Sequence, residues 1–203
     1  MNKSWDLSLI VGRFQGLHAG HVHLIETALS VSDRVLILIG SAQEHGTILN
    51  PFSATSRQNH IKSIFPQENI IIGSISDLND EKSVDSDWGW HLLNTAKQYT
   101  RKIPDVYIYG QEDKNLNWLK MSNGLKHASR NMTEIIIPRD RFNISGTTLR
   151  EWMVQDNFDK FLQHTHPKLH KLYPKMREEL MSAPEISASE IVKPLKPWSD
   201  KDV

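Results

Sequence analysis

The chain of 203 residues has 24 lysines and arginines and 24 aspartates and glutamates, so its formal net charge is zero. This balance gives no indication of the basic face that nucleic-acid-binding domains usually carry. The absence of cysteine excludes disulfides and thiolate-bound metal, and no apolar run in the sequence reaches the length of a membrane span. We therefore expect a soluble, cytoplasmic protein with neither nucleic acid nor a membrane as partner.

Five short apolar runs predict the β-strands. They cover residues 7–12, 34–40, 69–73, 105–110 and 133–138. Four of the runs end in glycine and the other ends in proline, so each has a clear stop signal. Because most of them are almost continuously apolar, they are typical of strands that are covered on both faces.

Amphipathic segments separate these runs. The first places four apolar residues on one helical face: Val22, Ile25, Ala28 and Leu29. Three more segments cover 53–65, 87–101 and 115–129. In the first of these three, Ile61, Ile64 and Phe65 are predicted to face inward. Alternating strands and helices predict an α/β fold with a doubly wound, five-stranded parallel sheet.

Beyond residue 145 the pattern becomes helical. We predict helices over 145–155, 158–164 and 168–182. The last segment, 183–203, is rich in proline and serine and has little periodicity. We expect it to be extended, either docked or mobile.

The stretch GRFQGLHAGH, residues 12–21, joins the first predicted strand to the first predicted helix. Ligands of open parallel sheets bind beyond the carboxyl ends of the strands, where a helix N-terminus offers free N–H groups to an anion. The three glycines let a phosphate approach the backbone, and His18 and His21 supply side-chain donors. The spacing matches neither G-x-G-x-x-G nor the P-loop, which indicates a nucleotide site of another design.

Three segments resemble the nucleotidyltransferase superfamily. GRFQGLHAGH resembles its H-x-G-H signature, and the leading GRFQ is similar to the nicotinamide-nucleotide adenylyltransferases. GSAQEHGTILNPFSATSR (40–57) is similar to the second segment of that family, and ISGTTLR (144–150) resembles its third motif. One departure is that Gly16 and Leu17 stand where the family usually has Pro-Phe. Without the proline we expect the turn to have more backbone freedom.

The resemblance implies a Rossmann-like nucleotidyltransferase fold over residues 1–155. From the helical pattern, we expect C-terminal helices over 156–182 that pack on the same domain. The resemblance also implies adenylyl transfer, in which the 5′-phosphate of nicotinamide mononucleotide (NMN) attacks the α-phosphorus of ATP and gives NAD and pyrophosphate. The attacking phosphate is already a nucleophile near neutral pH. The protein must therefore align two polyanions and neutralise the charge that builds between them, which suits histidines and arginines.

The resemblance also implies which residues contact ATP: Gly12, Arg13, Phe14, His18, Gly20, His21, Arg57, Gly110, Ser145, Gly146, Thr147 and Arg150. The catalytic set among them is His18, His21, Arg13, Arg57 and Arg150. His21 is expected nearest the transition state, and Ser145 is a natural N-cap for the helix that follows it. Arg150 is placed to clamp the leaving pyrophosphate, because guanidinium groups bind phosphate oxygens in a bidentate way.

The acceptor pocket is expected after the third strand, from Asn79, Asp80, Trp88 and Trp90. Only one tryptophan can readily stack on the nicotinamide, because helical residues two apart point about 200° apart. Mg²⁺ is expected together with ATP, since it bridges phosphate oxygens, and we name no protein ligand for it. The symmetric oligomers of related enzymes also imply a homo-oligomer.

Two alternatives stay open. The first is an adenylyltransferase with another acceptor, such as nicotinate mononucleotide or phosphopantetheine, although GRFQ and the tryptophan segment favour nicotinamide. The second is a regulator that binds nucleotides without turnover. The full set of motif histidines and arginines argues against a regulator, since a sensor has no leaving group to clamp.

Overall fold

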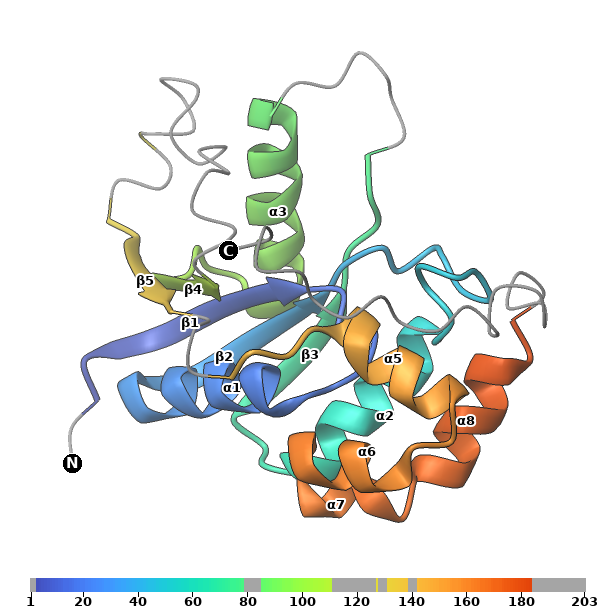
Figure 1. Ribbon diagram of the computed structural model, residues 1–203. Coiled ribbons are helices and arrows are strands. Elements are labelled where there is room, and N and C mark those ends of the chain that lie inside the picture. Colours follow the sequence, from blue (N-terminus) through green and yellow to red (C-terminus); the bar gives the residue numbers. More distant parts are fainter. Residues whose placement is uncertain (1–2, 79–84, 111–126, 128–130, 139–141, 184–203) are drawn as a thin grey trace, which may run out of the picture.

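A computed structural model describes residues 3–78, 85–110, 127, 131–138 and 142–183 (Figure 1). Its centre is a sheet in the order β3-β2-β1-β4-β5, in which all neighbouring strands are parallel. The strands are β1 (Trp5–Gly12), β2 (Ser32–Ile39), β3 (Ile70–Ser74), β4 (Val106–Gly110) and β5 (Thr133–Ile137). The predicted five-stranded parallel sheet is confirmed.

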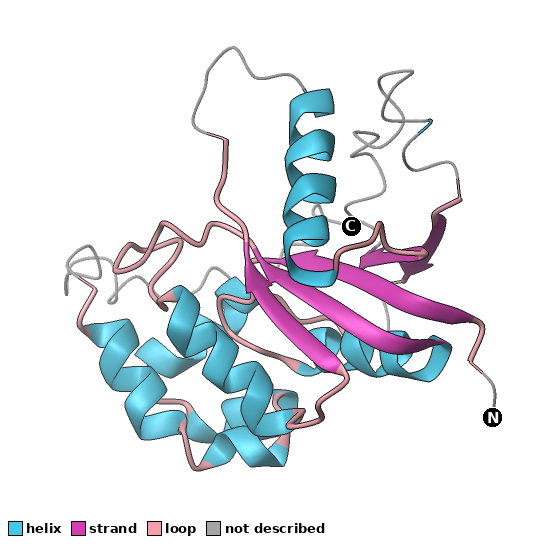
Figure 2. Ribbon diagram, turned by 180° about the vertical axis from the view of Figure 1, so that it is seen from behind, coloured by secondary structure: helices cyan, strands magenta, loops and turns pink. Residues whose placement is uncertain are grey.

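Helices cover both faces of this sheet (Figures 1 and 2). One face carries α3 (Asp85–Thr100). The other carries α1 (Ala19–Val31), α2 (Ala54–Ile64), α5 (Gly146–Val154), α6 (Phe158–His164), α7 (Pro167–His170) and α8 (Tyr173–Met181). None of the described helices is long and apolar enough to cross a membrane. Within the predicted helix 115–129 the structure describes His127 alone, and segment 184–203 lies outside the described residues.

The side chains of the central strands alternate between two apolar cores. Ile10 and Ile37 belong to the core that the sheet forms with α1, α2 and the C-terminal helices. Leu9 and Leu36, their neighbours in the strands, pack instead in the core that includes Leu92 of α3. Because both faces are buried, both the odd and the even positions of these strands are apolar, as the sequence indicated.

The C-terminal helices share the first of these cores. Phe161, Leu169 and Met176, from α6, α7 and α8, pack in the same cluster as Ile10 of β1. The prediction of one helix over 168–182 is wrong, because the chain forms α7 and then α8 with a break between them. Pro174 lies in the first turn of α8, and proline has no N–H to donate to the carbonyl four residues before it.

Strands β1 and β4 separate toward their carboxyl ends. β1 pairs with β2 from Trp5 to Gly12, but its pairing with β4 covers Ser8 and Leu9 alone. The chain order reverses at this point, with β2 and β3 on one side of β1 and β4 and β5 on the other. Ligands of doubly wound sheets bind in such an opening.

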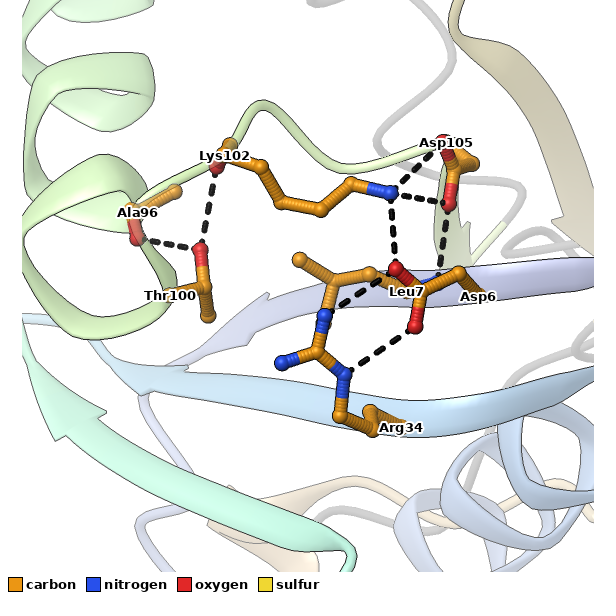
Figure 3. A network of polar contacts seen from close by, with 7 residues as sticks. All are labelled: Asp6, Leu7, Arg34, Ala96, Thr100, Lys102 and Asp105. Atoms are coloured by element: carbon orange, nitrogen blue, oxygen red, sulfur yellow. Dashed lines mark hydrogen bonds and ion pairs between the residues drawn. The ribbon is translucent and has the colours of Figure 1, made fainter.

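The opposite, amino end of the sheet holds a network of ion pairs (Figure 3). Asp6 accepts hydrogen bonds from Arg34 and from Lys102, each at 3.0 Å, and Lys102 also reaches Asp105 at 3.0 Å. Asp105 accepts in turn from the backbone N–H of Leu7 at 2.9 Å, which joins β1 to the segment before β4. The hydrogen bond from Arg34, followed by that from Lys102, lowers the pKa of Asp6 to about 2.

Candidate functional site

A cavity of about 390 Å³ lies where β1 and β4 separate. Val11 and Gly12 of β1 and Tyr107 and Gly110 of β4 line it, together with residues from the first turns of α1 and α5. The cavity therefore has two helix N-termini at its edge. Their backbone N–H groups lack partners within the helix, and the helix dipole makes both ends favourable for an anion.

The turn between β1 and α1 follows an unusual backbone path. Phe14 has a φ of 51° and Gly16 a φ of 100°, both in the left-handed region. Proline has its φ fixed near −65°, so a proline at position 16 could not adopt this conformation. The turn also runs close to α5, because a Cβ on Gly146 would lie 2.6 Å from the carbonyl oxygen of Gln15.

Long-range hydrogen bonds, rather than a proline, restrain the backbone of this turn. The side-chain amide of Gln15 donates to the carbonyl of Phe52 at 3.0 Å and accepts from the N–H of Phe52 at 3.0 Å. Arg150 donates from Nη1 to the carbonyl of Gln15 at 2.6 Å. Gln15 was not among the predicted site residues. Its position in GRFQ, as a polar residue between the apolar residues Phe14 and Leu17, was the available signal.

His18 and His21 lie together at the start of α1. Their ring centroids are 3.9 Å apart, and the ring of Phe14 lies 4.9 Å from that of His21. His18 is the N-cap of α1, and its Nδ1 accepts a hydrogen bond from the N–H of Gly20 at 3.1 Å. In the neutral ring the proton of His18 is therefore on Nε2, which makes that nitrogen a donor.

The start of α5 forms another wall of the cavity. Ser145 is the N-cap of α5, as predicted, and its Oγ accepts from the N–H of Thr148 at 3.1 Å. Ser145, Gly146 and Thr147 all line the cavity. Arg150 follows one turn later and donates from Nη2 to Oγ1 of Thr147 at 3.3 Å.

The charges around the cavity are of one sign. Arg13 and Arg150 line it, and among the described lining residues there is neither aspartate nor glutamate. Burial, followed by the positive charge of Arg13, lowers the pKa of Arg150 to about 10. Arg150 still carries its charge at neutral pH, so the cavity suits a polyanion.

Arg57 lies outside the lining of this cavity. It is fully buried, and its guanidinium donates to the carbonyls of Arg13 at 2.8 Å, Gly40 at 2.7 Å, Ser41 at 3.1 Å and Ser53 at 3.2 Å. Burial lowers its pKa to about 10. These contacts join the segments that follow β1 and β2. The expected contact of Arg57 with phosphate stays a prediction, whereas the other residues predicted to contact ATP all line the cavity.

The two tryptophans predicted to bind the acceptor differ in their position relative to the cavity. Trp88 lines the cavity, while Trp90 does not and is 39% exposed. Asn79 and Asp80 lie outside the described residues. The spacing Trp88–Leu92–Ala96, with Leu92 and Ala96 buried, was a signal in the sequence for the inward face of α3.

Aromatic residues that were not predicted also line the cavity. Tyr107 of β4 is one, and its ring stacks on that of Tyr109 at 4.8 Å. Phe142, just before the ISGTTLR motif, is another. No group of three or more metal-ligating histidine, aspartate or glutamate side chains occurs within the part of the chain that the structure describes.

Comparisons with known proteins identify the family. A family profile described as cytidylyltransferase-like matches residues 9–194. The nicotinamide-nucleotide adenylyltransferase of Picrophilus torridus is 39% identical over 157 residues, which cover 75% of this chain and 83% of that relative.

Two further relatives match over shorter segments. The nicotinamide-nucleotide adenylyltransferase of Thermoplasma acidophilum is 40% identical over 31% of this chain and 35% of that relative. The nicotinamide/nicotinic acid mononucleotide adenylyltransferase of Acinetobacter baylyi is 38% identical over 40% of this chain and 45% of that relative. The chain therefore covers less than half the length of either protein.

A solved structure has the same fold. It is the bifunctional NMN adenylyltransferase/ADP ribose pyrophosphatase of Francisella tularensis, with a TM-score of 0.69 and 20% identity over 88% of this chain and 53% of that chain. This likeness confirms the Rossmann-like nucleotidyltransferase fold. The family profile matches most of this chain, and the match to the Picrophilus torridus enzyme covers 83% of that relative. The chain therefore belongs to the cytidylyltransferase-like family, among the nicotinamide-nucleotide adenylyltransferases.

Proposed function

We propose that this protein transfers the adenylyl group of ATP to NMN and releases NAD and pyrophosphate. One observation carries the proposal: two helix N-termini, a histidine pair and two arginines meet in one cavity whose described lining contains no carboxylate. Such a set of donors suits the triphosphate of ATP and the phosphate of a mononucleotide together. The names of the relatives point to the same reaction.

The proposed reaction is an in-line displacement at the α-phosphorus. An oxygen of the NMN phosphate forms the new bond to that phosphorus, and the bond from it to the oxygen bridging to the β-phosphorus breaks. The bonding electrons leave with pyrophosphate. His18 and His21 donate hydrogen bonds to the phosphate oxygens that gain charge, and Arg150 with the first turn of α5 holds the departing phosphates.

We propose that a divalent cation, Mg²⁺ in the cell, enters as its complex with ATP. The described lining of the cavity has no carboxylate to hold a resident ion, so the ligands would be phosphate oxygens and water. The cation would neutralise part of the triphosphate charge, while Arg13 and Arg150 neutralise the rest.

The acceptor side is assigned to Trp88. Its indole lines the same cavity and offers a face on which a nicotinamide ring can stack. Asn79 and Asp80 stay candidates for the carboxamide. Trp90, outside the cavity lining, is not assigned a contact.

An acceptor panel tests the proposal. The purified chain is given ATP and Mg²⁺ with NMN, nicotinate mononucleotide or phosphopantetheine, and each product is separated and quantified. The expected result is NAD as the main product, at the highest kcat/KM. A higher kcat/KM for another acceptor would refute the assigned substrate, and the absence of any adenylylated product would favour the non-catalytic regulator.

The proposed homo-oligomer is tested separately. Light scattering coupled to size-exclusion chromatography measures the mass of the purified chain, whose single copy is 23.4 kDa. A mass that is a multiple of this value is expected, and a single-copy mass at micromolar concentration would contradict it.

A further inference from the structure

His91 lies three residues after Trp88 on α3, outside the lining of the cavity. Its Nε2 is 2.9 Å from the backbone carbonyl oxygen of Ser76, in the segment after β3. A carbonyl oxygen only accepts hydrogen bonds, so Nε2 of His91 carries the proton and donates. This bond ties the first half of α3 to the segment at the carboxyl end of β3.

The ring of His91 also contacts the ring of Trp88. Their centroids are 5.7 Å apart, with an angle of 55° between the planes. Residues three apart lie on the same side of a helix, so the two rings are neighbours on α3. Trp88 lies in the first turn of α3 and packs, partly buried, against the core that contains Leu92 and Leu93. The ring of His91 adds a second contact to the indole on the same side of the helix.

The segment that receives this hydrogen bond is itself held to the sheet. The N–H of Ile75 donates to the carbonyl of Ile39 at 2.9 Å, and the N–H of Ala42 donates to the carbonyl of Ile75 at 3.2 Å. The side-chain amide of Gln43 makes two hydrogen bonds to Asp77, one to its carboxylate and one from its N–H, each at 3.1 Å. His91 thus connects Trp88 to a fixed part of the structure.

We propose that His91 is a positioning residue for Trp88 and thereby sets the affinity of the enzyme for its mononucleotide acceptor. The inference rests on the proposed function and deepens it. His91 holds the indole at the angle at which the nicotinamide ring stacks, and it touches neither ATP nor the reacting phosphates. Its influence is therefore confined to acceptor binding.

The first test replaces His91 and measures steady-state kinetics for each substrate. In His91→Ala we expect the KM for NMN to rise about three- to tenfold, because a stacking contact is worth roughly that much in binding. The KM for ATP and the kcat at saturating NMN stay at their wild-type values. His91→Gln keeps an N–H donor near Ser76, and His91→Phe keeps a ring beside Trp88. Comparing the KM for NMN of these two variants shows whether the hydrogen bond or the ring contact orients the indole.

The decisive test is a double-mutant cycle. If His91 acts through Trp88, His91→Ala raises the KM for NMN in the wild-type background and has no effect in the Trp88→Ala background. Asn94→Ala, an exposed position one turn further along α3, is the matched control and leaves both KM values unchanged. Isothermal titration of NMN into each variant repeats the comparison without turnover, and thermal unfolding shows that each variant is folded.

The outcomes separate this inference from the proposed function. If the wild-type protein does not adenylylate NMN, the proposed function fails. If the wild-type protein does so but His91→Ala has the same KM for NMN, the positioning role is overturned. An equal effect of His91→Ala with and without Trp88, or an equal rise in the KM for ATP, overturns it as well.

Discussion

At the amino end of the sheet, the cations Arg34 and Lys102 meet carboxylates (Figure 3), whereas at the carboxyl end Arg13 and Arg150 face a cavity without a carboxylate in its described lining. The contacts at the amino end satisfy each charge with an opposite charge of the chain itself. At the carboxyl end, a guanidinium donates to a backbone carbonyl, and the remaining positive field is left for a ligand. The same residue types thus stabilise the fold at one end and attract polyanions at the other.

Arg57 belongs to the carboxyl end but behaves like the structural cations of the amino end. It is enclosed by four carbonyl oxygens from the segments that follow β1 and β2. A guanidinium can satisfy several carbonyls at once because it has five N–H donors in fixed directions. A place near the carboxyl end of the sheet is therefore not enough to assign a ligand contact.

The largest expected effect is that of replacing His21. In His21→Ala we expect kcat to fall about 10²- to 10⁴-fold, because a donor aimed at developing charge contributes that much. The dissociation constant for ATP should change far less. Rapid-quench kinetics gives the rate, and titration of ATP gives the affinity. His45→Ala, at an exposed loop position, is the control. Equal losses of rate and ATP affinity would contradict a role specific to the transition state.

Replacing Arg57 separates its two assignments. In Arg57→Met the buried carbonyls lose their donor, so we expect a loss of about 3–5 kcal/mol in the free energy of unfolding. Urea denaturation measures this loss, and Lys62→Met, an exposed position on the same helix, is the matched control. If Arg57 instead bound the triphosphate, stability would hardly change and the KM for ATP would rise.

The strands, the Ser145 cap and the place of the turn between β1 and α1 could be predicted because each depends on neighbours in the sequence. An apolar run covered on both faces, or a serine before a helix, carries its own signal. The contacts of Gln15 with Phe52 and of Arg57 with Arg13 could not be predicted, since these partners are 37 and 44 residues away and are backbone atoms. Only the folded chain brings such atoms together.

The choice between Trp88 and Trp90 depended on how α3 is rotated about its axis. From the sequence, either tryptophan was a candidate for the predicted acceptor pocket. The buried positions Leu92 and Ala96 fix the rotation, because they share a face with Trp88. The break before α8 was missed because helical periodicity continues across Pro174, although its ring and missing N–H interrupt the helix.

One added methyl group can perturb the close contact between α5 and the turn that follows β1. In Gly146→Ala the new Cβ would meet the carbonyl oxygen of Gln15 at 2.6 Å, so the turn and the α5 N-terminus must move apart. We expect kcat/KM to fall about 10- to 100-fold, since small displacements of aligned groups are costly in rate. Gly40→Ala is the matched control, because its Cβ would make an ordinary contact at 3.7 Å. Equal activities of the two variants would mean that the close approach is unimportant.

The smallest expected effect concerns the ion pairs of the amino end. The pKa of Asp6 is lowered from 3.8 to about 2, so its pairing stabilises the fold above pH 4 and the stabilisation is lost as the pH falls toward 2. Asp6 is 49% exposed and Arg34 40% exposed, and solvent screens such pairs. We therefore expect Asp6→Asn to cost about 0.5–1 kcal/mol at pH 7, less in 1 M salt, and nothing below pH 2. Urea denaturation across this pH range, with and without salt, measures the difference. A difference that is independent of pH would show that Asp6 acts through packing rather than charge, and the contrast between the two ends of the sheet would lose its electrostatic basis.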